Sequence, residues 1–478
     1  MHAIPRRRNC QDSVSHPMES SQADQILPRC HVVAIPYPGR GHINPMMSVC
    51  RLLASRGLLV SVVLTEEWLG LLCSGSAPPP LPNLRLVSIP NVIPSERSRG
   101  ADLNGFFQAV YTRMEAPVER LLERLEPPAD SIVVDANLVW AAEIGRRRSI
   151  PVTSFWTEAA SVLLALYRYG ELDDGGETPV DLSDREEEAL SFIPTPVSFS
   201  SHSTDFTFFT PGQDSFKKII PTFSWFNIAQ GLLVPTFYDL ESHAIDTLKS
   251  KLPLPIYPIG PCIPYMTLDN PQCNNNSRSD YIKWLDSQPK SSVLYISLGS
   301  FMPISGTQME EMASGIHASG VRFLWIVREE FKLLQELSGE MGLVLPWCDQ
   351  LRVLCHPSVG GFLTHCGWSS TMEGVFAGIP MLTFPLIWDQ FPNSRLIVDD
   401  WKVGVRVKIS QEQVVGREEI AKVVHDLMNL DALESKELRR RAKELKEKCH
   451  RALGDAGSST TNLNAFVQEI LDKKCGNA

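Results

Sequence analysis

The fold is decided by residues 31–64, which read HVVAIPYPGRGHINPMMSVCRLLASRGLLVSVVL. His31–Pro36 is a short apolar run that predicts a buried strand, and Pro38–His42 is a glycine-rich turn. Ile43–Arg56 has helical spacing, with Pro45 in its first turn, and a second β-branched apolar run follows it. Strand, turn, helix and strand in this order are typical of a βαβ unit in a parallel sheet.

The same alternation continues through most of the chain. Further strands are predicted at Leu84–Ile89, Ile132–Val134 and Val152–Phe155, and a second series of strands begins at Val293. Between the two series, residues 171–225 are rich in polar residues, proline and phenylalanine, which is typical of a lid, a binding region or a linker. The sequence therefore predicts an α/β protein with two Rossmann-like, doubly wound domains that face each other across a cleft.

Changes in composition set the expected division of the chain. Residues 1–29 are polar and aperiodic, and we expect a disordered extension there. The basic run Arg6–Arg8 also allows a transit peptide, but acidic residues follow it and count against that reading. Residues 30–252 are expected to form the N-terminal domain and residues 253–455 the C-terminal domain. Residues 456–478 are expected to form a helix that packs back on the N-terminal domain.

Composition also excludes several classes of protein. The 478 residues carry a formal net charge of -10, which repels the phosphate backbone of a nucleic acid. No run approaches the ~18 apolar residues of a membrane span, and no apolar segment follows the basic residues near the start. The eleven cysteines form no Cys-x-x-Cys pair, so neither a zinc site nor a disulfide framework is expected. We expect a cytoplasmic monomer without a nucleic-acid partner and without a membrane span.

The most informative stretch of the second half spans residues 347–390, and its densest part reads HCGWSSTME over residues 365–373. A predicted strand runs into a turn at Gly367, and a helix is expected to begin near Ser370. The amides and the positive dipole end of such a helix favour a phosphate group. Ser370 and Glu373 also have the spacing of a capping box, so a purely structural role for this pair stays open.

Residues 347–390 resemble the 44-residue nucleotide-sugar signature box of plant secondary-product UDP-glycosyltransferases, which belong to glycosyltransferase family 1. The opening WCDQ resembles the family 87 branch, and the resemblance extends from about residue 31 to the C-terminus. It implies a GT-B fold with an N-terminal acceptor-binding domain and a C-terminal domain that binds the UDP-sugar. It also implies a hexosyltransferase with UDP-glucose as co-substrate, a small-molecule acceptor, no metal and no other cofactor.

The resemblance implies roles for residues that contact the nucleoside. Trp347 is expected to stack on uracil, and the backbone of Cys348 is expected to bond the edge of the base. Gln350 is expected near the base and the ribose, and Glu373 is expected to accept the ribose hydroxyls.

The same resemblance implies the contacts of the diphosphate and the sugar. The turn and the helix start are expected to hold the phosphates through His365, Gly367, Ser369 and Ser370, together with Ser300 from the first strand of this domain. The sugar is expected to contact Trp368, Asp389 and Gln390, and Gln at the last position of the box favours UDP-glucose. Taken singly, the two tryptophans Trp347 and Trp368 fit core aromatics equally well, Asp389 fits a helix cap, and Ser300 fits a turn.

Two positions depart from the family pattern. Ser369 stands where the family usually has an asparagine that helps to hold the phosphates, and losing one hydrogen bond to a charged group costs roughly 1.5–3 kcal/mol. Asp349 stands where the family generally has proline. The first departure predicts weaker donor binding or slower turnover.

A catalytic pair is implied in the first half. An acceptor hydroxyl attacks poorly until a base takes its proton, and a histidine oriented by a carboxylate suits that task at neutral pH. The resemblance places the base at His42 and the carboxylate at Asp135, each at the carboxyl end of a predicted strand. Thr157 matches a family contact to the sugar or phosphate. Taken alone, each of the three residues also fits a helix cap or a surface position.

The acceptor is not identified by the sequence. Aromatic residues in the expected pocket are Phe106, Tyr111, Trp140 and Trp388, together with the neighbouring Phe107. They favour a lipophilic acceptor with a hydroxyl or a carboxyl group, although pockets of this size are mostly apolar in any case. Inverting transfer to such an acceptor gives a β-glucoside.

Two other functions were weighed against this one. A nicotinamide-dependent oxidoreductase would use Gly39-Arg40-Gly41 and Glu66, but Asn44 stands where the third glycine of that fingerprint belongs. The second alternative is a non-catalytic member of the family that binds a UDP-sugar or a small molecule. Only Ser369 favours it, while the retained His42 and Asp135 count against it.

Overall fold

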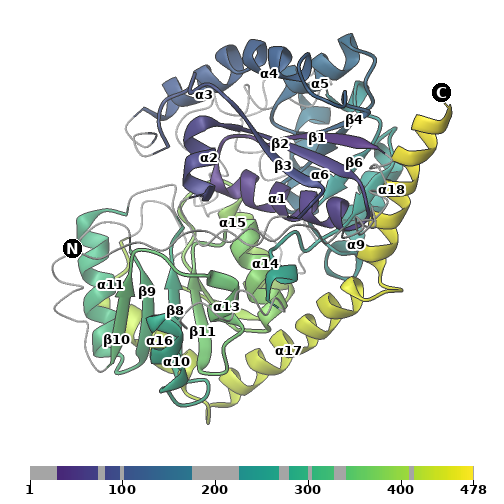
Figure 1. Ribbon diagram of the computed structural model, residues 1–478. Coiled ribbons are helices and arrows are strands. Elements are labelled where there is room, and N and C mark those ends of the chain that lie inside the picture. Colours follow the sequence, from purple (N-terminus) through teal and green to yellow (C-terminus); the bar gives the residue numbers. More distant parts are fainter. Residues whose placement is uncertain are drawn as a thin grey trace, which may run out of the picture.

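The computed structural model describes residues 30–73, 81–96, 99, 102–174, 225–268, 279–299, 304–327, 341–407 and 414–476. Two α/β units lie one above the other, and the last two helices of the chain run along them, one beside each unit (Figure 1). The predicted disorder of residues 1–29, most of the irregular segment and Ser300 lie outside the described residues.

The first sheet has seven parallel strands in the order β3-β2-β1-β4-β5-β6-β7. Its strands are β1 (His31–Ile35), β2 (Leu59–Thr65), β3 (Leu84–Ile89), β4 (Ser131–Asp135), β5 (Val152–Phe155), β6 (Leu232–Val234) and β7 (Ile256–Pro258). The helices of this unit are α1 (Arg40–Ser55), α2 (Glu66–Cys73), α3 (Leu103–Arg113), α4 (Glu115–Leu122), α5 (Val139–Arg147), α6 (Ala160–Asp174) and α9 (Tyr238–Lys251). The central strands are buried on both faces, which explains their continuous apolar sequence.

The second sheet has six parallel strands in the order β10-β9-β8-β11-β12-β13. They are β8 (Val293–Ser297), β9 (Arg322–Ile326), β10 (Gly342–Leu345), β11 (Val359–Thr364), β12 (Met381–Thr383) and β13 (Gly404–Arg406). The helical elements are α10 (Asp280–Asp286), α11 (Gly306–Ala318), α13 (Gln350–Leu354), α14 (Trp368–Ala377), α15 (Gln390–Arg395), the π-helical turn η5 (Leu396–Asp400) and α16 (Arg417–Met428).

Both sheets confirm the predicted doubly wound α/β fold. The order of strands reverses between β1 and β4 in the first sheet and between β8 and β11 in the second. Ligands of such sheets bind beyond the carboxyl ends of the strands at this reversal. The two reversals therefore locate the part of each domain where a site is expected.

The boundary between the two sheets differs from the predicted division after residue 252. Ile256–Pro258 pairs in parallel with β6 as the edge strand of the first sheet, so this sheet extends beyond the predicted boundary. The proline-rich sequence PLPIYP suggested a linker, but an edge strand tolerates proline because one side of it needs no ladder hydrogen bonds.

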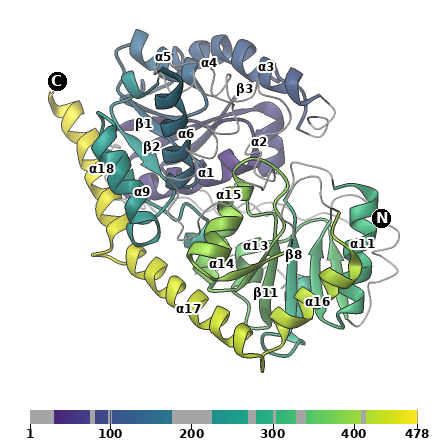
Figure 2. The same cartoon turned by 180° about the vertical axis from the view of Figure 1, so that it is seen from behind.

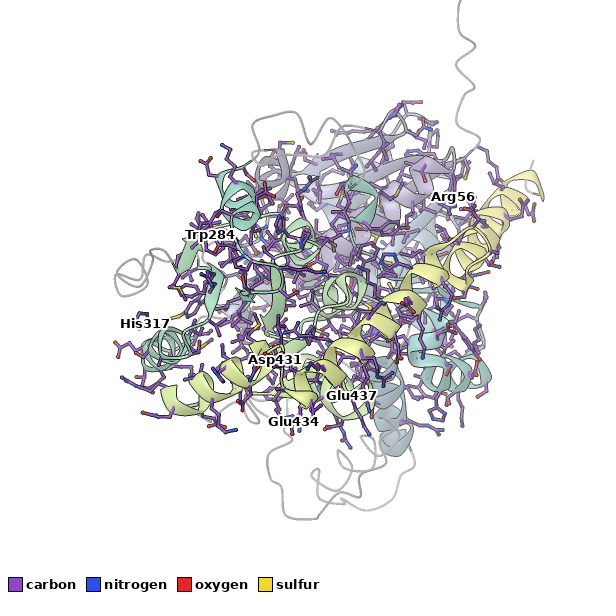
Figure 3. All side chains as sticks on the ribbon, turned by 90° about the horizontal axis from the view of Figure 1, so that it is seen from below. Arg56, Trp284, His317, Asp431, Glu434 and Glu437 are labelled. Carbon is purple, nitrogen blue, oxygen red and sulfur yellow. The ribbon has the colours of Figure 1, made fainter. Side chains whose placement is uncertain are left out.

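The last two helices join the two units. Helix α17 (Leu433–Leu453) contacts α14 of the second unit and α9 of the first, and α18 (Ser458–Gly476) contacts β7 (Figure 2). Asn462 Nδ2 donates to the carbonyl of Pro258 at 2.9 Å, and Arg56 Nε donates to Asn464 Oδ1 at 2.8 Å. Figure 3 shows Arg56 beside α18. The apolar side of α18 is buried in the core of the first sheet through Leu463, Phe466 and Ile470.

Two further expectations from the sequence concern the start of one helix and the lack of a membrane-spanning segment. Helix α14 begins at Trp368, with Gly367 as its N-cap, rather than near Ser370. Within the described ranges, none of the helices combines the length and the apolar character needed to cross a membrane.

Candidate active site

His42 and Asp135 meet at the reversal point of the first sheet. His42 lies in the first turn of α1 after β1, and Asp135 ends the neighbouring strand β4. His42 Nδ1 lies 2.8 Å from Asp135 Oδ2. The carboxylate is fully buried, whereas 24% of the His42 side chain is exposed. The imidazole is therefore accessible while its partner is held in the protein.

The other carboxylate oxygen of Asp135 is held by Asn137, two residues later in the chain. Asp135 Oδ1 accepts from the backbone N–H of Asn137 at 3.0 Å and from Asn137 Nδ2 at 3.3 Å. Asp135 does not cap α5, because Leu138 stands at that N-cap position. Since a carboxylate only accepts hydrogen bonds, Nδ1 of His42 carries the hydrogen and Nε2 retains a lone pair. That arrangement leaves Nε2 able to act as a base.

Thr157 completes this cluster at the end of β5. Its Oγ1 lies 3.0 Å from His42 Nδ1, and its side chain is buried. The hydroxyl predicted to contact the donor therefore lies against the imidazole, on the same side of the ring as Asp135.

The beginning of the signature box presents an aromatic face to solvent. Trp347 is 53% exposed, which is unusual for tryptophan and leaves its ring open to stacking. Cys348 is buried, with its Sγ 3.4 Å from the hydroxyl of Tyr295. Asp349 is the N-cap of α13, and its side chain accepts from the Arg352 N–H at 3.2 Å. Capping gives a structural reason for aspartate at the position where proline was expected.

Gln350, Ser370 and Glu373 form one hydrogen-bonded group. Gln350 Nε2 donates to Ser370 Oγ at 2.9 Å and to Glu373 Oε2 at 2.5 Å, and Gln350 Oε1 accepts from the Tyr295 hydroxyl at 3.0 Å. Ser370 lies inside α14, so the capping-box interpretation is wrong. Burial raises the pKa of Glu373 to about 7, and the bond from Gln350 opposes that rise.

The N-terminus of α14 is left without a side-chain cap. Gly367 provides none, and the first turn contains no acidic residue, so the backbone amides remain open to an anion. His365 lies between two glycines, because a Cβ at Gly299 or Gly367 would come within 3 Å of its Nε2. Burial lowers the pKa of His365 to about 4, so it is a neutral hydrogen-bonding group near pH 7. Ser369 is half-buried at the second position of this helix.

Asp389 and Gln390 stand at the start of α15, each held by a specific contact. Asp389 Oδ2 accepts from Asn393 Nδ2 at 2.8 Å, and Asp389 does not cap the helix with its side chain. Gln390 Oε1 accepts from the N–H groups of Leu386 and Ile387 at 2.8 and 3.1 Å. These two backbone donors fix the orientation of the amide. Gln390 can therefore offer only its NH2 group to a ligand, while Asp389 offers a carboxylate.

Trp368 connects the two domains through its side chain. Its indole is buried, and Nε1 donates to the carbonyl of Pro235 in the first unit at 3.0 Å. The side chain thus joins the two domains, and the Trp368 backbone interacts with the Asp389 carboxyl. Trp388, just before Asp389, has a left-handed backbone with φ of 51°, a strained conformation that is often found at functional sites.

The aromatic residues expected around the acceptor are divided between core and surface. Phe106 and Trp140 are buried, Tyr111 is 40% exposed, and Trp388 is half-buried. Phe107 and Trp388 approach across the domain boundary with ring centroids 6.0 Å apart. Phe106 supports this layer from within the core, where its ring lies 6.3 Å from that of Tyr37.

The described part of the chain contains no group of three or more His, Cys, Asp or Glu side chains arranged to hold a metal ion.

Sequence reasoning missed three polar residues. Asn137 and Asn393 hold Asp135 and Asp389, and Glu158 follows Thr157 in the loop after β5. Asn393 stands four residues after Asp389, which is one helical turn, so this spacing could have revealed it. Nothing in the local sequence distinguishes Asn137 or Glu158 from ordinary loop residues.

Comparisons with known proteins agree with this geometry. Residues 236–435 match the family model described as UDP-glucoronosyl and UDP-glucosyl transferase. The chain is 46% identical over 451 residues to UDP-glycosyltransferase 87A2 of Arabidopsis thaliana, covering 92% of this chain and 97% of that protein.

The chain is also similar to solved structures over most of its length. Os79 from O. sativa in complex with U2F and trichothecene has a TM-score of 0.78 and 27% identity, covering 92% of this chain and 100% of that one. Medicago truncatula UGT71G1 complexed with UDP-glucose has a TM-score of 0.74 and 26% identity, covering 93% and 99%. The chain is a glycosyltransferase enzyme with the GT-B fold and belongs to the plant UDP-glycosyltransferases of family 1.

Proposed function

We propose that this enzyme transfers glucose from UDP-glucose to a hydroxyl, or a carboxyl, of a small lipophilic plant metabolite, with inversion at the anomeric carbon and without a metal. The observation that carries the proposal is the hydrogen bond between His42 and the buried Asp135, which leaves Nε2 of an accessible imidazole free to take a proton. Phe107 of the first domain and Trp388 of the second, the residue before Asp389, approach with ring centroids 6.0 Å apart, which supports a site shared by the two domains.

The reaction proposed is a single in-line displacement. His42 Nε2 takes the proton of the acceptor hydroxyl while its oxygen forms a bond to the anomeric carbon. The bond from that carbon to the β-phosphate oxygen breaks at the opposite face, and UDP leaves with the electron pair. An α-linked donor therefore gives a β-glucoside. Asp135 accepts a hydrogen bond from the Nδ1–H group of His42 and so stabilises the imidazolium that forms.

The reaction also requires that the negative charge on the departing UDP be stabilised. The uncapped amides of α14 supply aligned donors and the positive end of a helix dipole, which stabilise negative charge as it develops. Because its pKa is lowered, His365 stays neutral near pH 7 and is proposed to contribute a hydrogen bond to the phosphates rather than a positive charge.

Recognition of the sugar is proposed to use Asp389 and Gln390 together. A sugar carries adjacent hydroxyls, and each can donate one hydrogen bond and accept another. The Asp389 carboxylate accepts and the Gln390 NH2 group donates, so the pair matches two neighbouring hydroxyls. UDP-glucose in the Medicago truncatula complex and the trichothecene in the O. sativa complex support a sugar nucleotide and a lipophilic acceptor here.

The proposal is tested by UDP release from UDP-glucose across a panel of plant phenols, terpenoids and hormones. Acceptor-dependent release is expected, and NMR of the product should show the large anomeric coupling of a β-glucoside. An α-linked product would refute inversion. Binding of UDP-glucose without release for any acceptor would favour the non-catalytic member, and Ser369→Asn would then be assayed for gain of turnover.

Binding of UDP is expected to strengthen as pH rises towards 8, because Glu373 must be ionised to accept both ribose hydroxyls. Its pKa of about 7 means that it is protonated below that pH, where bound UDP would have to displace the proton. Linkage then gives a loss approaching tenfold in affinity per pH unit below the pKa. Isothermal titration calorimetry between pH 5.5 and 8 measures this slope.

Glu373→Gln is the control for this pH dependence. UDP itself gains a proton near pH 6, and that part of the slope should persist in the variant. The part due to Glu373 should disappear. Equal slopes for the wild-type enzyme and the variant would contradict the assignment of Glu373 to the ribose.

A further inference from the structure

Tyr295 is a buried tyrosine beneath the start of the signature box, and the mechanism above does not use it. It lies on β8, pairs in register with Phe362 of β11, and is 1% exposed. Its ring centroid lies 5.3 Å from that of Phe362, so the ring is part of the hydrophobic core. Phenylalanine would fill the same space, whereas a buried tyrosine hydroxyl needs a hydrogen-bond partner. The contacts of the hydroxyl therefore show what tyrosine adds at this position.

Two side chains of the box are the partners of this hydroxyl. Tyr295 Oη donates to Gln350 Oε1 at 3.0 Å and lies 3.4 Å from Cys348 Sγ. An amide oxygen only accepts, so the single hydrogen of the hydroxyl belongs to Gln350, and the thiol of Cys348 is left to donate to Oη. Burial raises the pKa of Tyr295 well above its usual value, so the hydroxyl keeps this hydrogen at the pH of any assay.

The other end of the Gln350 amide contacts two residues of α14. Its Nε2 has two hydrogens, which it donates to Ser370 Oγ at 2.9 Å and to Glu373 Oε2 at 2.5 Å. If the amide were turned over, its oxygen would face the Glu373 carboxylate, which only accepts when it is ionised. Tyr295 thus stabilises, from behind, the one orientation of the amide that suits a charged Glu373.

The exposure of these residues separates the buried end of the chain of hydrogen bonds from its open end. Tyr295 lies out of reach of a ligand, whereas Glu373 is half-buried. Glu373 Oε2 accepts from Gln350, and among the described residues no hydrogen bond reaches Oε1. Tyr295 can therefore act on a nucleotide only through Gln350 and Glu373.

We propose that Tyr295 is a positioning residue for the donor, whose hydroxyl holds the Gln350 amide in the orientation that donates to Glu373 and leaves one carboxylate oxygen for the ribose hydroxyls. This inference rests on the proposed function, because it needs Glu373 to accept those hydroxyls. Tyr295 itself contacts neither substrate and takes no part in the transfer of the proton or of the sugar.

The first test compares UDP with dideoxyuridine diphosphate, the analogue that lacks both ribose hydroxyls. Calorimetry at pH 8, above the Glu373 pKa of about 7, gives both affinities for the wild-type enzyme and for Tyr295→Phe, which removes only the hydroxyl. The wild-type enzyme should bind UDP at least about tenfold more tightly than the analogue, since hydrogen bonds to a charged group are lost. The variant should narrow that ratio about three- to tenfold and bind the analogue as the wild-type enzyme does.

A double-mutant cycle tests whether the effect passes through Glu373. Glu373→Ala removes the acceptor of the ribose hydroxyls and should bring the affinities for UDP and the analogue close together. Adding Tyr295→Phe to that variant should then narrow the ratio no further, because both changes remove the same interaction. Independent, multiplying effects of the two substitutions on the ratio would overturn the proposal.

Tyr257→Phe is the matched control, because it removes a hydroxyl that is bonded to the Glu469 carboxylate in the first domain. Its ratio should equal that of the wild-type enzyme. An equal loss of affinity for both nucleotides in Tyr295→Phe would mean that the hydroxyl only supports the fold, and it would overturn the proposal. A ratio that collapses in Glu373→Ala but not in Tyr295→Phe would overturn this inference alone and leave the proposed function standing.

The second test is turnover with UDP-glucose and the best acceptor from the panel. Tyr295→Phe should raise KM for UDP-glucose about three- to tenfold and change kcat by less than about twofold, because a contact to the ribose is made equally before and during the reaction. A lower kcat with an unchanged KM would contradict a positioning role at the ribose.

Discussion

Replacing His42 with alanine is expected to lower kcat by about 10²–10⁴-fold, the usual contribution of a positioned general base. The acceptor hydroxyl then has only water to take its proton. The affinity for UDP should change little, because the proposed function gives His42 the proton of the acceptor and gives the nucleotide contacts to residues of the second domain. Steady-state kinetics with the best acceptor, together with calorimetry for UDP, measures both quantities.

Two variants make this result specific. His317→Ala removes an exposed histidine on the outer side of α11 (Figure 3) and should leave kcat unchanged. Asp135→Asn preserves the shape of the pair but offers an amide where Nδ1–H needs an acceptor, so it should also lower kcat. If His42→Ala retained more than a tenth of the activity, another residue would have to serve as the base.

Replacing Phe466 with alanine is expected to destabilise the first domain by about 3–5 kcal/mol, the usual cost of removing a buried phenylalanine ring. Phe466 is buried in the core of the first sheet, and its ring centroid lies 5.6 Å from that of Tyr257 on β7. The cavity would open where the last helix meets the edge strand. Differential scanning calorimetry measures the loss as a lower transition temperature.

Leu433→Ala is the control for this stability prediction. Leu433 begins α17, and it is 83% exposed. Its neighbour Glu434 is labelled in Figure 3. Removing an exposed apolar side chain should change stability by no more than about 0.5 kcal/mol. An equally small effect of Phe466→Ala would mean that α18 contributes little to the first domain, and the inferred role of the last helix would then be wrong.

The structure gives a physical explanation for one of the two residues at which the signature box departs from the family pattern. Asp349 is retained as a helix cap, and the start of the box keeps its geometry without proline. Ser369 has no comparable explanation, because its short side chain simply replaces a longer amide at the second position of α14. If α14 holds the diphosphate as proposed, the effect of that change is expected at the phosphates, which would still meet the uncapped amides of α14.

The sequence by itself determined the elements and the edges at which the site lies. Buried parallel strands must be continuously apolar, and their carboxyl ends meet at one edge of the sheet. This is why His42 and Asp135, each at the end of a predicted strand, could be expected to meet. The resemblance of residues 347–390 to the family then added the expected donor-binding residues, which the hydrophobic pattern could not reveal.

Only the tertiary structure decided which way the polar side chains of the cleft point. The Trp368 indole donates to the carbonyl of Pro235, 133 residues earlier in the chain, and so joins the two domains. Phe107 and Trp388 belong to different domains, and their rings approach only after both domains have folded and docked. Local propensity and hydrophobic period report how a segment folds, but they carry no information about a contact between loops of two sheets. For that reason the sequence and its family resemblance indicated the reaction class, whereas only the fold shows that the side chains of His42, Asp135 and Thr157 meet.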